Sequence, residues 1–236
     1  MVIGAGAEAG LGAKLAQCFA REGLRVFVAG RTAARLNAIA EGIKQAGGLA
    51  EPKVADATRE KEVIALFDEA ARHDDLELVV YNVGNTLAAP LLDLAAADFE
   101  TLWRQNALGG FLAGREAVRR MLPKGRGTIL FTGATASLRA RPPFTGFASA
   151  KAALRAVAQG LAREFGPQGI HVAHVVIDGV IDGAYAREKF PDFVRAKGEE
   201  GLVDPAAIAD MFLALHRQPK SAWTHELDLR PFRETF

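Results

Sequence analysis

The sequence predicts an α/β protein built on a doubly wound parallel sheet of about seven strands, with helices on both faces. Short β-branched segments alternate with longer helical patterns along the whole chain, as expected of parallel strands joined by helical crossovers. Half of the 236 residues are hydrophobic and 24% are charged, a balance that allows a large buried core. Nothing in the composition resembles a linker, so residues 1–236 are expected to form one domain.

The elements follow a βα order that is repeated six times and closed by a final strand. The expected strands are 2–5, 25–29, 50–54, 76–81, 127–131, 171–177 and 225–229. The expected helices are 10–22, 32–46, 59–72, 98–122, 146–165 and 204–217. Asp204 as a cap and Pro205 at the first helical position mark the start of the last helix. A reversal of winding after the third strand would place a ligand crevice beyond the carboxyl ends of the strands.

Charge and cysteine content exclude several classes of function. Lys and Arg total 29 against 28 Asp and Glu, so a net charge of +1 gives no general attraction for nucleic acid or an anionic membrane. Cys18 is the only cysteine, which excludes an internal disulfide and a cysteine-rich metal site. The five histidines lack metal-ligand spacing, and no apolar stretch approaches the ~20 residues of a membrane span. We therefore expect a cytoplasmic protein with no metal, nucleic-acid or membrane partner.

The first strand leads through Gly4-Ala-Gly-Ala-Glu-Ala-Gly10-Leu-Gly12 into an amphipathic helix. The helix turns a set of apolar residues toward the sheet: Leu11, Leu15, Cys18 and Phe19. Glycines let the backbone approach a pyrophosphate closely, and the free N–H groups at the helix start supply donors and a partial positive charge. Glycines alone are often only structural, but the spacing Gly6-xxx-Gly10-x-Gly12 between a strand and a helix predicts a phosphate-binding loop.

This motif resembles the short-chain dehydrogenase/reductase family, whose glycine motif has the same spacing. Further segments match the family pattern in chain order: Asp56 after the third strand, Asn82-Val-Gly84 after the fourth, Asn106 in the next helix, Lys151 in the helix after that, and Asp178-Gly-Val-Ile-Asp182 after the sixth strand. The resemblance extends from the first strand to the last. It implies a Rossmann-type domain, an oxidoreductase that acts on a small carbonyl or alcohol, and a homo-oligomer of two or four chains.

The resemblance also implies a role for each matched position. It assigns cofactor binding to Gly6, Glu8, Gly10, Leu11, Gly12, Arg31, Asp56, Ala57, Asn82, Val83, Gly84, Lys151, Gly179 and Ile181. It assigns the catalytic set to Asn106, Lys151 and the positions of Phe147 and Ala134. A substrate loop inserted at 183–203 contains Tyr185, the candidate substrate contact.

Most of these residues also have an ordinary structural explanation. Asn82 could tie two strands together, Asp56 could stabilise a turn, and Asn106 could make a buried hydrogen bond in the apolar face that it shares with Phe99 and Trp103. Lys151 is harder to explain in this way, because lysine seldom lies on an inward helix face without a group to bind.

The residues after the second strand favour NADP over NAD. An acidic residue there would bind the ribose hydroxyls of NAD. The strand instead ends in Gly30-Arg31, as in family members that prefer NADP, and a guanidinium suits a 2′-phosphate. Arg35 could assist, whereas the carboxylate of Glu8 in the glycine loop is unfavourable near a phosphate. NAD remains the alternative cofactor.

The family pattern breaks at the two hydroxyls that carry out acid–base chemistry. Phe147 stands at the tyrosine position four residues before Lys151, and Ala134 stands at the serine position. Reduction of a carbonyl by hydride needs a proton on the oxygen, and neither side chain can supply one. Substitutes could come from the loop hydroxyls or from the segment after the sixth strand: Thr132, Thr135, Ser137, Asp182 and Tyr185.

Three functions are compatible with this sequence. The first is an NADP-dependent oxidoreductase with an altered proton route. The second is an NADP(H)-binding protein that catalyses nothing, and the third is a cofactor-independent enzyme that reuses the crevice. Whether the chain is an enzyme therefore depends on what replaces the hydroxyl missing at Phe147.

Overall fold

A parallel sheet forms the centre of the protein. The computed structural model describes residues 1–198 and 200–234, apart from the side chain of Tyr185. The strands are β1 (Val2–Ile3), β2 (Arg25–Gly30), β3 (Leu49–Val54), β4 (Leu78–Tyr81), β5 (Gly127–Thr132), β6 (Ile170–Ile177) and β7 (Glu226–Leu229). Their order in the seven-stranded sheet is β3-β2-β1-β4-β5-β6-β7, so the winding reverses after β3. The expected doubly wound α/β fold is confirmed.

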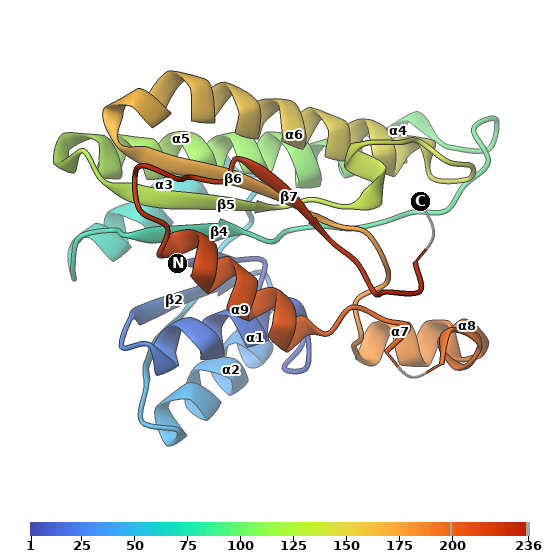
Figure 1. Cartoon of the computed structure of the whole chain (residues 1–236), viewed down its shortest axis with the longest axis horizontal. Coiled ribbons are helices and arrows are strands. Elements are labelled where there is room, and N and C mark those ends of the chain that lie inside the picture. Colours follow the sequence, from blue (N-terminus) through green and yellow to red (C-terminus); the bar gives the residue numbers. More distant parts are fainter. Residues whose placement is uncertain (199, 235–236) are drawn as a thin grey trace.

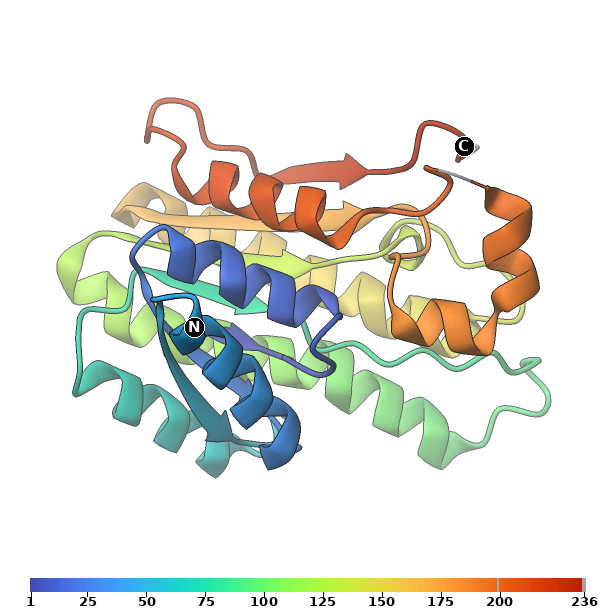
Figure 2. The ribbon, with the colours of Figure 1, turned by 90° about the horizontal axis from the view of Figure 1, so that it is seen from below.

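Helices cover both faces of this sheet (Figure 1). One face carries α1 (Leu11–Arg21), α2 (Ala33–Gln45) and α9 (Pro205–His216). The other carries α3 (Glu60–Ala71), α5 (Gly109–Met121) and α6 (Thr145–Phe165), with α4 (Ala96–Trp103) leading toward α5. Figure 2 shows α7 (Ala184–Lys189) and α8 (Pro191–Lys197) at the end of the sheet to which the strand arrows point. A parallel sheet carries its ligand sites at that carboxyl end.

Each face of the sheet packs its own apolar core. Val28, Val80 and Val175 belong to the cluster with α1 and α9, whereas Phe27 and Phe131 belong to the cluster with α3, α5 and α6. Strands covered on both faces become continuous apolar runs, and all eight residues of β6 are buried. Burial on both sides fixes the register of the strands, and therefore the positions of the residues that follow them.

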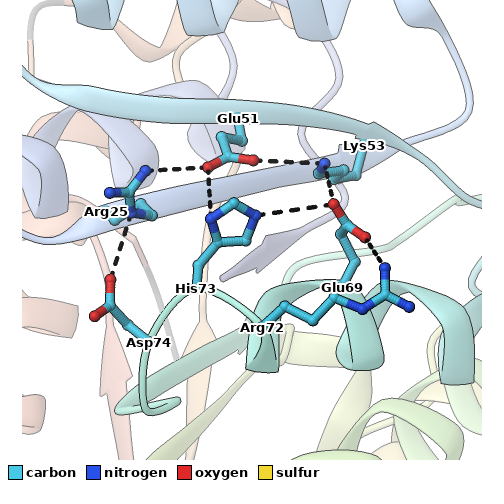
Figure 3. Close-up of polar contacts among 7 residues, drawn as sticks. All are labelled: Arg25, Glu51, Lys53, Glu69, Arg72, His73 and Asp74. Carbon is cyan, nitrogen blue, oxygen red and sulfur yellow. Dashed lines mark hydrogen bonds and ion pairs between the residues drawn. The ribbon is translucent and has the colours of Figure 1, made fainter.

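The edge strand β3 is surrounded by a charged-edge cluster (Figure 3), made by Arg25, Glu51, Lys53, Glu69, Arg72, His73 and Asp74. Lys53 lies 3.5 Å from Glu51 and 3.2 Å from Glu69. His73 lies between the same carboxylates, 3.7 Å from Glu51 and 3.8 Å from Glu69. Pro52 adds a position without an N–H donor. Charges and a proline make an edge strand a poor template for pairing with another chain.

The prediction of one helix at 98–122 is wrong in one respect: this segment is not a single α-helix. A π-helical turn over Arg104–Leu108 separates α4 from α5. An extra residue in this wider turn changes which side chains share a face. Asn106 is fully buried, whereas Phe99 and Trp103, expected on its face, are 41% and 42% exposed.

The segment expected as an insertion, 183–203, is bordered by backbone pairing. Ile181 and Val203 form a parallel bridge, and the Val203 N–H donates to the Val180 carbonyl at 2.9 Å. Between these ends the chain contains α7 and α8. The segment therefore leaves and re-enters the fold at neighbouring points beside the carboxyl end of β6.

Candidate functional site

A cleft of about 260 Å³ opens at the carboxyl ends of β1 to β4. It is lined by Ile3, Gly4, Ala5, Gly6, Gly30, Arg31, Thr32, Arg35, Ala55, Asp56, Ala57, Thr58, Asn82, Val83, Gly84, Asn85 and Gln105. Seven of the residues expected to bind a cofactor are in this lining: Gly6, Arg31, Asp56, Ala57, Asn82, Val83 and Gly84. The other residues expected to bind a cofactor lie outside the lining: Glu8, Gly10, Leu11, Gly12, Lys151, Gly179 and Ile181.

The glycine loop is shaped by close backbone contacts on one side and is open on the other. A Cβ at Gly12 would lie 2.7 Å from the carbonyl oxygen of Gly4, and Gly4 itself has φ +99°. A Cβ at Gly6 would meet no atom of the described residues within 4 Å, and Gly6 lines the cleft, so this backbone is open to it. Gly10 precedes α1 without a side-chain cap, which leaves N–H donors at the helix start. This combination fits a pyrophosphate.

The other residues of the loop have different positions. Glu8 is exposed and does not line the cleft. Leu11 and Gly12 are buried in the first turn of α1, where they hold the helix against the sheet. Leu11 and Gly12, expected to bind the cofactor, are thus packing residues here, and Gly6 is the residue of the loop whose backbone is open to a ligand.

A second part of the cleft is basic and lies after β2. Arg31 is exposed, and Arg35 joins it in the lining one helical turn later. Across the cleft, burial raises the pKa of Asp56, but hydrogen bonds from the N–H and hydroxyl of Thr58 and the charge of Arg31 outweigh it, so the pKa is below its usual value. Asp56 therefore remains a carboxylate that faces the guanidinium of Arg31.

Asn82 ties the strands together under the cleft floor. Its Nδ2 donates to the carbonyl oxygen of Gly4 at 3.1 Å, and its Oδ1 accepts from the hydroxyl of Thr132 at 3.0 Å. The structural explanation of Asn82 is thus observed, and the same bonds hold the turns after β1, β4 and β5 in register. Gly84, two residues later, is exposed in the cleft.

Lys151 is a buried cation behind Gly84. Its Nζ donates to the carbonyl oxygen of Thr132 at 2.9 Å and lies 5.8 Å from the ring centroid of Phe147. Phe147 and Lys151, four residues apart in α6, therefore lie on one face of this helix. Burial of the ammonium lowers the pKa of Lys151 to about 8.

Asn106 lies opposite Lys151. Its Nδ2 donates to the carbonyl oxygens of Leu102 at 2.9 Å and Asn85 at 3.4 Å. Its Oδ1 is buried and has no hydrogen-bond partner among residues 1–198 and 200–234. A Cβ built on Gly84 would lie 3.4 Å from Lys151 Nζ and 3.7 Å from Asn106 Oδ1, so a donor and an acceptor converge beside this glycine.

Two threonine hydroxyls near Ala134 donate to other protein groups, whereas a serine hydroxyl accepts a hydrogen bond. Thr132 donates to Asn82, and Thr135 donates to a carboxylate oxygen of Asp178 at 2.5 Å. The Oγ of Ser137 accepts from the N–H of Ala134 at 3.1 Å. Ala134 is half-buried at the start of the short turn that holds these residues.

Asp178, which follows β6, is held by cations as well. Arg139 lies 3.4 Å from its carboxylate and Arg230 lies 3.2 Å from it. The next residue, Gly179, has φ +157°, and a Cβ there would lie 2.9 Å from Pro231. Gly179 therefore packs against the segment after β7.

The end of this segment is fixed by pairing with the insertion. Ile181 packs on the core and bridges to Val203. The carboxylate of Asp182 accepts two hydrogen bonds from Arg187, at 2.7 and 2.6 Å. Both carboxylate oxygens of Asp182 are therefore engaged by one guanidinium. The side chain of Tyr185 lies outside the described part of the structure.

A further polar cluster, made by His174, Glu226 and Arg155, lies near Lys151, and no sequence pattern indicated it. His174 Nδ1 lies 3.0 Å from Glu226, and Arg155 donates to both carboxylate oxygens of Glu226 at 2.6 Å. A Cβ at Gly133 would lie 2.4 Å from the other ring nitrogen of His174, so the ring fills the space beside the turn that carries Ala134. Burial lowers the pKa of His174 from 6.5 to about 4, although Glu226 opposes the shift.

Sequence reasoning also missed Thr58, Asn85 and Gln105 in the cleft lining. A signal existed for Thr58, because an aspartate two residues before a threonine often forms a side-chain turn. Gln105 had none, because its position depends on the π-helical turn.

Other kinds of site find no support in the described residues. A larger hollow of about 670 Å³ lies at the opposite end of the strands, around Met1, Arg25 and Leu78, and contains none of the expected site residues. The side chains of residues 1–198 and 200–234 include no group of three His, Cys, Asp or Glu that could hold a metal ion. None of the helices in this part of the chain has the length and apolar character to cross a membrane.

Comparisons with known proteins agree with this geometry. A family model described as short chain dehydrogenase matches residues 1–192. Gluconate 5-dehydrogenase of Gluconobacter oxydans (strain 621H) is 30% identical over 222 residues, which cover 89% of this chain and 85% of that protein. The crystal structure of a short-chain dehydrogenase from Rhodopseudomonas palustris is 41% identical with a TM-score of 0.84, covering 98% of this chain and 97% of that one.

An alcohol dehydrogenase from the archaeon Thermococcus sibiricus, complexed with 5-hydroxy-NADP, is 25% identical with a TM-score of 0.85, covering 99% of this chain and 97% of that one. The match of the family model over most of the chain and the relatives that align along nearly their full length lead to one conclusion. The chain belongs to the short-chain dehydrogenase family.

Proposed function

We propose that this chain is an NADP-dependent oxidoreductase that interconverts a small carbonyl compound and its alcohol. One observation carries the proposal: the open glycine loop and Arg31 line one cleft, and Lys151 and Asn106 converge on its end beside Gly84. One surface would therefore hold the phosphates of a dinucleotide at the glycine loop, its adenosine end at Arg31 and its nicotinamide end at Lys151 and Asn106.

The residues present fit a dinucleotide. Gly6 is the backbone position open to a pyrophosphate, and Arg31 with Arg35 suits a 2′-phosphate. Asp56 and Ala57 line the cleft on the side of Arg31, where an adenine ring can contact them. The buried Oδ1 of Asn106 has no hydrogen-bond partner among the described residues, so a bound ligand can satisfy it. The NADP analogue in the Thermococcus sibiricus relative supports the same preference.

Each catalytic position has a defined task in this proposal. A bound nicotinamide would supply the hydride for carbonyl reduction. Lys151 holds the polar end of the cofactor and places a positive charge beside the reacting oxygen, while Asn106 keeps the π-helical turn closed against Asn85. Gly179 and Ile181 border the cofactor where the insertion at 183–203 begins, and Tyr185 in this insertion is the candidate substrate contact.

Nucleotide binding is tested by calorimetry with NADPH and NADH. Removal of a charge-assisted contact costs about 1.5–3 kcal/mol, so Arg31→Ala should weaken NADPH binding by roughly 10–100-fold and NADH binding by less than threefold. Arg163→Ala, on the exposed side of α6, is the matched control and should change neither. Equal losses for both nucleotides would contradict the NADP preference.

Turnover is tested with a carbonyl and alcohol panel. Gluconate is included because the Gluconobacter oxydans relative is named for it. We expect NADPH consumption with at least one carbonyl compound and its loss in Lys151→Ala. Phe147→Tyr combined with Ala134→Ser should raise the rate if the surrounding frame is intact.

A second candidate function is NADP(H) binding without catalysis. It is favoured by the absence of hydroxyls at Phe147 and Ala134 and by the engagement of Thr132 and Thr135 with other groups. Tight NADPH binding with no turnover across the panel would select this function. Failure to bind either nucleotide would instead favour a cofactor-independent enzyme.

A further inference from the structure

Neither the side chain at position 147 nor the two threonine hydroxyls near Ala134 supply the proton that the reaction needs. Phe147 has no donor, and the hydroxyls of Thr132 and Thr135 donate to Asn82 and Asp178. A hydroxyl that donates its only proton to a neighbour offers a ligand lone pairs instead. A carbonyl oxygen needs a donor, so these two threonines do not meet the requirement of the reaction.

Lys151 differs from these groups because it has donors to spare. An ammonium carries three N–H bonds, and the described structure records one hydrogen bond of Nζ, to the carbonyl oxygen of Thr132. The side chain is 3% exposed, so bulk water does not satisfy the others. Nζ also faces the exposed backbone of Gly84, where Asn106 Oδ1 supplies an unpaired acceptor.

This pair of donor and acceptor can hydrogen-bond both a carbonyl substrate and its alcohol product. A carbonyl oxygen accepts a hydrogen bond, which Lys151 Nζ can donate. The alcohol formed from it can also donate one, as Asn106 Oδ1 can accept. The side chain at 147 contributes a ring but no competing proton, with its centroid 5.8 Å from Nζ.

We propose that Lys151 is itself the general acid of this chain, protonating the carbonyl oxygen in place of a tyrosine at position 147. The assignment rests on the proposed oxidoreductase function. In the reductive direction a bound reduced nicotinamide would supply a hydride, with its electron pair, to the carbonyl carbon. The Nζ–H bond breaks, an O–H bond forms, and the neutral amine of Lys151 regains a proton from water after product release.

The charges around Lys151 are compatible with this role. His174 faces it from β6 and is neutral near pH 7, since burial lowers the pKa of His174 to about 4. Glu226 on β7 is held by Arg155 of α6, so the two charges offset each other. Thr132 on β5 and Asn106 in the π-helical turn contribute dipoles only. Burial is thus the main cause that brings the pKa of Lys151 down to about 8.

The first experiment measures Lys151 without nucleotide. An NMR titration of the lysine side-chain signals, assigned by comparison with Lys151→Arg, should give a midpoint near 8, against about 10.4 for an ordinary lysine. The kcat/KM for carbonyl reduction should then fall tenfold per pH unit above that midpoint. A midpoint at 10 or higher overturns the assignment whatever the activity.

The second experiment separates an acid from a cofactor ligand. Arginine keeps the positive charge but holds its proton at any working pH, so Lys151→Arg should bind NADPH while its kcat for reduction falls about 10²–10⁴-fold. In a Phe147→Tyr background the tyrosine can act as the acid, and the same replacement should then cost less than tenfold. Lys53→Arg, in the charged-edge cluster, is the matched control and should change neither quantity.

The outcomes distinguish the two levels of the proposal. Equal costs of Lys151→Arg in both backgrounds mean that lysine only holds the cofactor, which overturns the acid assignment and leaves the oxidoreductase function standing. NADPH binding without turnover of any carbonyl overturns both. A cost that shrinks in the tyrosine background, with the midpoint near 8, supports the assignment.

Discussion

His174 is a buried side chain that packs behind the turn carrying Ala134. Its ring occupies the space that a side chain at Gly133 would need, and Nδ1 lies 3.0 Å from Glu226. Glu226 is in turn held by Arg155, one helical turn after Lys151. The folded protein thus favours the neutral form of His174. Protonation of the ring would place a buried positive charge near Lys151.

At the residue scale we therefore expect stability to depend on His174 in mild acid. Because the folded-state pKa of about 4 lies below the ordinary 6.5, the stabilisation is full above pH 6.5 and is lost as the pH falls toward 4. Between pH 7 and pH 5 the loss should be roughly 2 kcal/mol in the free energy of unfolding. Urea unfolding of the wild type and His174→Gln checks this, and equal pH slopes would contradict it.

At the element scale, periodicity accounts for what could be predicted and what could not. The alternation of strands and helices, the glycine loop and the one-turn spacing of Phe147 and Lys151 are local patterns, so the sequence was sufficient for them. The π-helical turn at Arg104–Leu108 breaks the helical period without a glycine or proline within it, and the face of Asn106 was mispredicted for that reason. His174 and Glu226 meet only because β6 and β7 pair in one register, which no local pattern reveals.

The edge strand β3 gives a prediction of its own. Glu51 pairs with Arg25, Lys53 and His73, but its side chain is 23% exposed and the pairs are partly solvated. Glu51→Gln should therefore lower the free energy of unfolding by less than about 1 kcal/mol at low ionic strength. The difference should disappear in 1 M NaCl, where the screening length is about 3 Å. A loss that persists in high salt would mean that packing of Glu51, rather than charge, stabilises the edge.

At the scale of the whole molecule, the distribution of exposed apolar side chains bears on assembly. The two cores account for the faces of the sheet, but Leu92 is 98% exposed before α4, and Phe99, Trp103 and Phe111 are each exposed by more than two-fifths along α4 and α5. Large exposed apolar side chains along two consecutive helices are expected where another protein covers the surface. A second copy of this chain is the expected partner.

We therefore expect two or four chains per particle in solution, measured by light scattering after size-exclusion chromatography. Replacing Trp103 by Lys would place a charge in the contact, where an unpaired buried charge is costly, so the variant should shift toward the monomer. Leu49→Lys is the control, because Leu49 is 52% exposed on the distant edge strand β3. A wild type that is monomeric at high concentration, or a Trp103 variant that assembles as well as the Leu49 variant, would show that α4 and α5 do not form the contact. If the prediction holds, the contact lies beside the candidate cofactor cleft, because the cleft lining includes none of these four apolar residues but does include Gln105, two residues after Trp103.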